Sequence, residues 1–178
     1  MTYDERIRCQ EGLTQWCAAQ HANYFLTLRF NNQFPLSPDR AERSLRHFDA
    51  QLDRKFLGGG WASVPASLRT RFIAIPEGRP TGSGFRDFHD VHYHLIVHTP
   101  PARKSGINDA DLRAFVGRAW RNCEAAGDVN LQALLTDEDR RQVASYACKD
   151  VWRRNSVGRD RFVIAPMAQA KSIPAFGV

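Results

Sequence analysis

The sequence is poor in the residues that build disulfide frameworks, zinc cages and membrane spans. Its 178 residues include only four cysteines, and none of them form a Cys-x-x-Cys pair. Scattered cysteines of this kind are typical of reduced thiols in a cytoplasmic protein. No apolar run reaches the roughly 20 residues that a membrane-spanning helix needs, and the polar N-terminus does not resemble a signal peptide. We therefore expect a soluble cytoplasmic protein with no membrane partner.

Lysine is also scarce, because the basic excess comes almost entirely from arginine. The formal net charge is +6 and the pI is about 9.5, yet only four of the 25 basic residues are lysines. Arginine binds phosphate through two parallel hydrogen bonds, so this bias favours a polyanionic partner. The sequence also lacks a Gly-x-x-x-x-Gly-Lys-Ser/Thr loop, which excludes a built-in ATPase or helicase of the P-loop type.

The length and the apolar content of 43% fit one compact domain with an ordinary core. Hydrophobic periodicity and capping residues predict helices over 2–21, 37–58, 108–127 and 136–154, and strands over 23–30, 68–77, 90–98, 129–135 and 161–165. Pro76 predicts that the second strand is an edge strand or carries a bulge. We expect residues 1–155 to form the domain, and 156–178 to be a C-terminal extension with a further strand and a loose tail.

The order of these elements indicates the fold class. After an N-terminal helix the chain runs β-α-β-β-α-β and then enters a last helix. This order predicts an α+β fold with an antiparallel sheet of four to five strands, as in ferredoxin-like and RRM-like domains. The helices would lie mainly on one face of the sheet, which leaves the other face open for a ligand.

Two histidines interrupt the apolar strand over 90–98. Side chains alternate along a strand, so His92 and His94 point to the same face, while Tyr93, Leu95 and Val97 point to the opposite face. A strand with a core on one side and paired imidazoles on the other is a candidate half of a metal site. The alternative is a pair of hydrogen-bonded histidines in a half-buried sheet.

The last predicted helix carries Tyr146 and Lys149, which are three residues apart and share a helix face. A phenol has an ordinary pKa near about 10, so it attacks poorly at neutral pH without help. A neighbouring ammonium and a metal-polarised phosphate supply such help. This spacing suits attack on phosphorus, whereas the alternative is a surface tyrosine beside a solvated lysine.

Three segments together resemble the HUH endonucleases, specifically the single-tyrosine rolling-circle replication initiator proteins. They span roughly residues 23–150 and comprise the strand Phe25-Leu26-Thr27-Leu28, the strand with His92 and His94, and the helix with Tyr146 and Lys149. Each motif is weak alone, but their order and the elements expected to carry them are much more specific.

The resemblance implies a metal-dependent enzyme that nicks and joins single-stranded DNA at a specific site. His92 and His94 would ligate a divalent ion, Mg²⁺ or Mn²⁺, with a carboxylate from the preceding strand. Tyr146 would attack the scissile phosphate, leaving a 5′-phosphotyrosine link and a free 3′-hydroxyl, and Lys149 would position or charge-compensate that centre. As the third ligand we expect Glu77, with Asp87, His89 and Asp90 as alternatives.

The resemblance also implies a substrate, which is single-stranded or hairpin DNA at the replication origin of a plasmid or phage. Thr27 and Arg29, on the face of the histidines, and Arg153, a turn beyond Lys149, are the expected DNA contacts. Because no second tyrosine follows one turn after Tyr146, a second cut needs another protomer, as in a homodimer, or a vacated tyrosine. Unwinding and extension would fall to a host helicase and polymerase.

Other functions use the same residues. Relaxases and single-tyrosine transposases share these catalytic parts, although the Tyr-x-x-Lys spacing favours a replication protein. A basic DNA-binding module without chemistry would use the histidines for structure alone. A metalloenzyme with a small-molecule substrate is a further alternative, against which the arginine excess argues.

Overall fold

The computed structural model describes residues 2–31, 36–80, 88–100, 107–149, 151 and 163–165; of residues 38, 79, 80 and 88–90 it describes only the backbone. The helices are α1 (Tyr3–Ala18), α2 (Pro38–Leu57), α3 (Asp109–Cys123) and α4 (Asp137–Cys148). The strands are β1 (Tyr24–Arg29), β2 (Arg71–Pro80), β3 (Phe88–His98), β4 (Asp128–Ala133) and β5 (Val163–Ala165). Two short 3-10 turns, Trp61–Ser63 and Ala66–Leu68, link α2 to β2.

The strands form one antiparallel sheet in the order β4-β1-β3-β2-β5. The segment from β1 to β4 follows the predicted β-α-β-β-α-β order of a ferredoxin-like α+β fold, which confirms the fold class. β3, which carries the histidine pair, lies at the centre between β1 and β2. The strand expected in the C-terminal extension is present as β5, which pairs with β2; the remainder of 156–178 lies outside the described residues.

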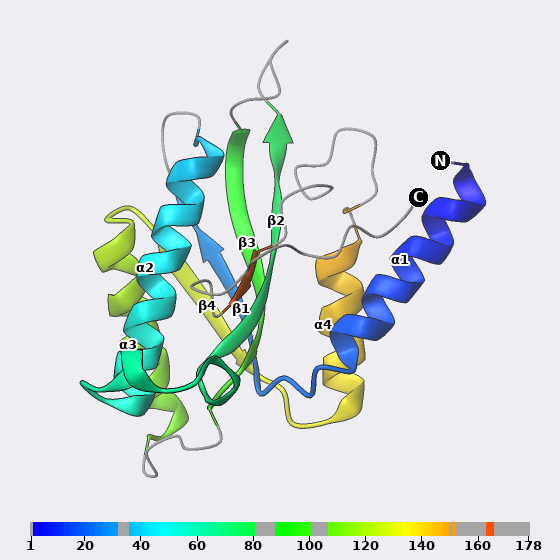
Figure 1. Ribbon diagram of the computed structural model, residues 1–178. Coiled ribbons are helices and arrows are strands. Elements are labelled where there is room, and N and C mark those ends of the chain that lie inside the picture. The colour runs from blue at the N-terminus through cyan, green and yellow to red at the C-terminus, as the bar shows by residue number, and fades with distance from the viewer. Residues whose placement is uncertain are drawn as a thin grey trace.

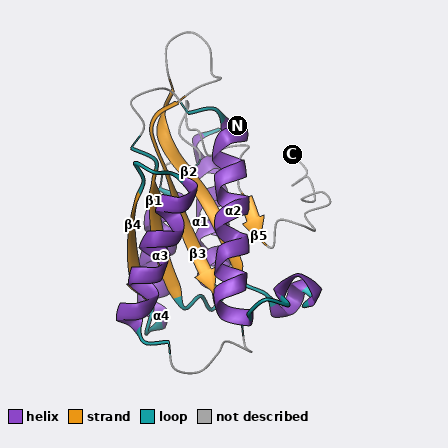
Figure 2. Cartoon of the chain, turned by 90° about the vertical axis from the view of Figure 1, so that its left-hand side faces the viewer, coloured by secondary structure: helices purple, strands orange, loops and turns teal. Residues whose placement is uncertain are grey.

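The helices cover both faces of the sheet. Figure 1 shows α2 and α3 on one side of the strands and α1 and α4 on the other, and Figure 2 shows α2 and α3 in front of the sheet. The expectation of helices mainly on one face, with an open second face, is therefore wrong in this respect. The second face is apolar over part of its area, and α1 and α4 bury that part with small and branched side chains.

Alternation along the strands builds both cores. Tyr24, Leu26 and Leu28 of β1 belong to the core beneath α2 and α3. Phe25 belongs to the second core, beneath α1 and α4. The second core also contains side chains of the neighbouring strands, of the two helices and of the turn beyond α4, namely Ile73, Ile75, Ile96, Cys17, Val143, Ala144, Ala147, Cys148 and Val151. His92 and His94 thus lie on the same face of β3 as Ile96 of this second core.

The capping residues recognised in the sequence begin the helices. Ser37 accepts a hydrogen bond from the backbone N–H of Arg40, with proline at the first helical position. Asn108 caps α3 in the same way through the N–H of Asp111. Gly58 ends α2 with a φ of 87°, a left-handed value that favours glycine because it has no Cβ.

Neither a membrane-spanning helix nor a disulfide is present among the residues that the structure describes. None of the helices in the described part of the chain is both long enough and apolar enough to cross a membrane. Cys9, Cys17, Cys123 and Cys148 are free thiols. Cys17 of α1 and Cys148 of α4 are both buried with their sulfur atoms 4.0 Å apart, so they pack the two helices together.

Candidate metal centre and nucleophile

The strand register aligns the candidate residues in two neighbouring rows across the sheet. Glu77 of β2 lies opposite His92 of β3, which in turn lies opposite Arg29 of β1. In the next row His94 lies opposite Thr27. Directly opposed residues of antiparallel strands point to the same face, so the register alone places these polar side chains together.

Glu77, His92 and His94 form a cluster of metal-ligand type. One oxygen or nitrogen from each lies within 4.8 Å of the others. Glu77 Oε2 is 2.9 Å from His94 Nε2 and 3.4 Å from His92 Nε2. Two imidazoles and one carboxylate are a donor set that divalent cations accept, with further positions left for other oxygen ligands. The three side chains can therefore hold a metal ion.

The course of β2 explains how Glu77 reaches the histidines. β5 pairs with β2 only at Phe72 to Ala74, so Pro76 needs no partner on that side, and the pairing with β3 shifts register between Glu77 and Arg79. The expectation of an edge strand is thus wrong for β2 as a whole, because β5 lies outside it, whereas the expected irregularity is present as a register shift just after Glu77. A bulge of this kind re-aims side chains beside functional sites. Of the alternative third ligands, Asp87 and the side chains of His89 and Asp90 lie outside the described residues.

His94 is held neutral by its surroundings. Its side chain is only 1% exposed, and this burial lowers its pKa to about 4, although the neighbouring Glu77 favours the charged form. Burial alone would raise the pKa of Glu77, but hydrogen bonds from His94 and Lys149 hold it below its ordinary value. A neutral imidazole beside an ionised carboxylate is the protonation state in which both groups can bind a metal ion.

The buried neutral histidine predicts acid sensitivity of the metal-free protein. Between pH 6.5 and about 4 the unfolded chain binds a proton at His94 that the folded chain does not bind, so stability falls as the pH falls. We expect this group to remove on the order of 3 kcal/mol from the free energy of unfolding across that window. Urea unfolding in the presence of a chelator measures it. An equally steep pH dependence in His94→Gln would contradict this assignment.

Thr27 contacts the ring nitrogen of His94 that points away from Glu77. Its Oγ1 is 3.2 Å from His94 Nδ1. Because an ionised Glu77 only accepts hydrogen bonds, His94 Nε2 donates to it, and Nδ1 then accepts from the Thr27 hydroxyl. If Nε2 binds a cation instead, Nδ1 carries the proton and donates to the same hydroxyl. A hydroxyl group serves both tautomers, so Thr27, expected as a DNA contact, can hold the His94 ring in either state.

This arrangement predicts that metal affinity depends on the Thr27 hydroxyl. Thr27→Val keeps the shape of the side chain but removes the hydrogen bond, and we expect Mn²⁺ affinity to fall about tenfold, as is common for groups that orient a ligand. Thr27→Ser retains the hydroxyl and should bind Mn²⁺ like the wild type. Direct titration without DNA provides the measurement, and equal affinities for the valine and serine variants would contradict the role.

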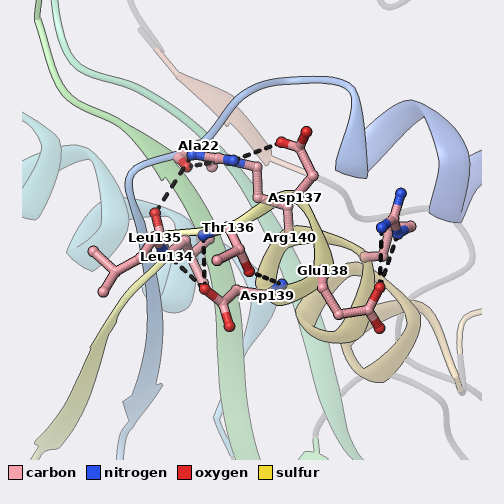
Figure 3. Close-up of polar contacts among 9 residues, drawn as sticks. Ala22, Leu134, Leu135, Thr136, Asp137, Glu138, Asp139 and Arg140 are labelled. Atoms are coloured by element: carbon pink, nitrogen blue, oxygen red, sulfur yellow. Dashed lines mark hydrogen bonds and ion pairs between the residues drawn. The ribbon is translucent and has the colours of Figure 1, made fainter.

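Hydrogen bonds hold the start of α4 against the ends of two strands, as Figure 3 shows. Thr136 and Asp139 form a reciprocal capping box at the first turn. The Arg140 guanidinium donates to the carbonyl oxygens of Ala22, at 3.0 Å, and Leu134, at 3.5 Å. These bonds join α4 to the segments that precede β1 and follow β4, so the helix enters the site at a fixed position.

Tyr146 lies on α4 with its ring beside the histidines. Its ring centre is 5.1 Å from that of His94, at an interplanar angle of 70°. Phe25 fixes both rings, because it stacks on His94 at 5.5 Å and meets Tyr146 edge-on at 6.3 Å. The tyrosine is 50% exposed and borders an open depression along α4, whose lining is Glu138, Arg141, Gln142, Ser145 and Tyr146. A large ligand can therefore reach the phenol.

Lys149 connects the tyrosine with the carboxylate. Its Nζ is 3.1 Å from Glu77 Oε2 and 3.6 Å from the centre of the Tyr146 ring. Burial would lower the pKa of Lys149, but hydrogen bonding to Glu77 and Tyr146 raises it above the ordinary value. α4 ends at Cys148, which is earlier than the predicted 154. Lys149 is therefore the C-cap residue and lies just beyond the last helical turn.

The remaining predicted residues lie as follows. Arg29 is exposed in the row of His92, and its Nη1 is 4.0 Å from Asp128 Oδ2. Arg153 lies outside the described residues. His98, on the same face of β3, is half-buried with its Nδ1 3.1 Å from Asn23 Oδ1 and thus supports the strand end. Phe25 was missed from the sequence, although alternation places it on the face of Thr27 and Arg29.

Comparison with known proteins adds no family to this geometry. No family model, curated protein or solved structure matches the chain. The functional argument therefore depends on the side chains alone.

Proposed function

We propose that this chain is a single-tyrosine HUH-type endonuclease that nicks and joins single-stranded DNA. One observation carries the proposal: Tyr146 and Lys149 from α4 meet Glu77, His92 and His94 from the sheet within a single site. A nucleophile, a cation and a metal-ligand set are the parts that phosphodiester cleavage through a covalent intermediate requires. The side chains come from β2, β3 and α4, so their convergence is a property of the fold rather than of one segment.

The chemistry follows from these groups. A divalent cation at Glu77, His92 and His94, Mg²⁺ or Mn²⁺, would polarise the scissile phosphate. The Tyr146 oxygen attacks phosphorus, a new P–O bond forms to the phenol, and the bond from phosphorus to the 3′ oxygen breaks. The products are a 5′-phosphotyrosine link and a free 3′-hydroxyl. Lys149 balances the negative charge on the phenol oxygen and the phosphate.

The DNA would approach over the exposed side of the site. Arg29 lies in the row of His92, where its guanidinium can contact a phosphate next to the scissile one. The Tyr146 ring is half exposed, so a strand could reach it from solvent beside the depression that α4 lines. We further propose a role in starting rolling-circle replication of a plasmid or phage in the cytoplasm, with unwinding and extension by a host helicase and polymerase.

A cleavage assay tests the proposal. The protein is incubated with Mn²⁺ and end-labelled single-stranded and hairpin oligonucleotides from the replicon that encodes it, and the products are separated on a denaturing gel. We expect a protein–DNA adduct that appears only with the divalent cation and carries the DNA segment on the 3′ side of the nick. Binding of these oligonucleotides without any adduct would instead indicate the non-catalytic DNA-binding module.

A further inference from the structure

The Lys149 ammonium lies on the carboxylate oxygen of Glu77 that faces both histidines. Glu77 Oε2 is contacted by His94 Nε2 at 2.9 Å, by Lys149 Nζ at 3.1 Å and by His92 Nε2 at 3.4 Å. Each carboxylate oxygen offers about two lone pairs, so the two shorter contacts already use the directions from which Oε2 could bind a cation. The imidazole can release its contact by a change of tautomer, as described above, whereas the ammonium has to move.

The same ammonium has a second position within reach. Lys149 Nζ already lies over the Tyr146 ring, 3.6 Å from its centre, and the two residues are three apart at the end of α4. Lys149 is the C-cap residue with a half-buried side chain on a flexible four-carbon stem. Rotation about side-chain bonds can therefore carry Nζ from Glu77 toward the Tyr146 oxygen without any movement of the helix.

We propose that Lys149 is an exchangeable counter-ion of the metal site. In the metal-free protein it neutralises Glu77, and when a divalent cation binds Glu77, His92 and His94, Lys149 leaves the carboxylate and pairs with the Tyr146 oxygen. This inference rests on the proposed function and adds a regulation to it. In the metal-free protein the ammonium contacts both Glu77 and Tyr146, and it serves the phenol alone only when the metal site is filled, because the two cations repel each other across Glu77.

The exchange makes an unusual prediction, namely that removal of a positive side chain strengthens metal binding. Lys149→Met keeps the length of the stem but has no charge, so the cation neither displaces an ion pair nor meets a like charge. We expect Mn²⁺ to bind Lys149→Met about tenfold more tightly than the wild type, which corresponds to about 1.4 kcal/mol. Lys149→Arg keeps the charge and should bind within about threefold of the wild type. If Lys149 were merely structural, its removal would instead weaken Mn²⁺ binding.

The measurement is a titration of the full-length protein with Mn²⁺ alone, followed by electron paramagnetic resonance of the free ion. Lys55→Met is the matched control, because Lys55 also lies over an aromatic ring, that of Phe115, but on the opposite side of the sheet. It should bind Mn²⁺ like the wild type. Thermal melts of all variants in a chelator verify that they fold.

A second readout separates this inference from the proposed function. With single-stranded DNA present, Lys149→Met should reach half-maximal adduct formation at a lower Mn²⁺ concentration but form the adduct at least tenfold more slowly. Equal or weaker Mn²⁺ affinity in Lys149→Met, while the wild type binds Mn²⁺ and forms the adduct, overturns the exchange and leaves the proposed function standing. A wild type that binds no Mn²⁺ overturns both.

Discussion

Tyr146→Phe is expected to abolish the covalent protein–DNA adduct while leaving the fold and the metal site intact. The substitution removes one oxygen atom, and the ring keeps its edge contacts with Phe25 and His94 and its place beneath the Lys149 ammonium. Because the residue is half exposed, little stability is lost. Loss of a nucleophile removes most of the rate enhancement of an enzyme, so we expect adduct formation to fall at least about a thousandfold.

Two comparisons sharpen this result. Tyr3→Phe is a matched control, because Tyr3 is also exposed but lies at the start of α1, away from the sheet face. It should form adduct at the wild-type rate. Tyr146→Phe should still bind Mn²⁺ and single-stranded DNA within about twofold of the wild type, since phosphate contacts dominate affinity. An adduct that persists in Tyr146→Phe would assign the nucleophile to another residue.

Much of this site was predictable because it is built on local periodicity. Alternation along β3 determines that His92 and His94 share a face, and alternation along β1 adds Thr27 to it. The pairing of neighbouring strands then leaves few carboxylates that can reach the pair, and Glu77 at the end of the preceding strand is one of them. Residues at fixed spacing on regular elements keep their relative directions whatever the rest of the chain does.

The covering of the second sheet face was not predicted, although the sequence carries a signal for it. β2 reads Phe72-Ile73-Ala74-Ile75, a continuous apolar run, and a strand of that kind is buried on both faces. The polar residues of β1, taken alone, predict an open face. The C-terminal end of α4 carries no signal of this kind, because neither glycine nor proline follows Cys148 closely.

The contact between Lys149 and Glu77 could not be predicted at all. The two residues are far apart in the chain, and the contact depends on how α4 crosses the sheet. That crossing is set by non-local bonds, such as those from Arg140 to Ala22 and Leu134. Tyrosine and lysine at one turn's spacing indicate a shared helix face, but not which strand the face meets.

His92→Ala is the second variant with a large expected effect, and it tests the metal centre. His92 lies in the row of Glu77 and Arg29, its Nε2 is 3.4 Å from Glu77 Oε2, and its side chain is 23% exposed. Removal of one of three protein ligands should weaken Mn²⁺ binding at least about tenfold and reduce adduct formation at least about a hundredfold. Because His94 is far more buried, His94→Ala would combine this loss with a cavity, so His92 is the better residue for the test.

The DNA affinity of His92→Ala distinguishes a metal-binding role of His92 from a purely structural one. If His92 binds the metal ion, His92→Ala should keep DNA affinity within about threefold of the wild type, because contacts to the phosphate backbone persist. His47→Ala, at an exposed histidine of α2 on the far side of the sheet, should change neither binding nor cleavage. Excess Mn²⁺ should restore part of the activity of His92→Ala, since two ligands remain. Parallel losses of DNA binding, cleavage and thermal stability would mean that the histidine pair maintains the sheet, and the catalytic proposal would then fail at its centre.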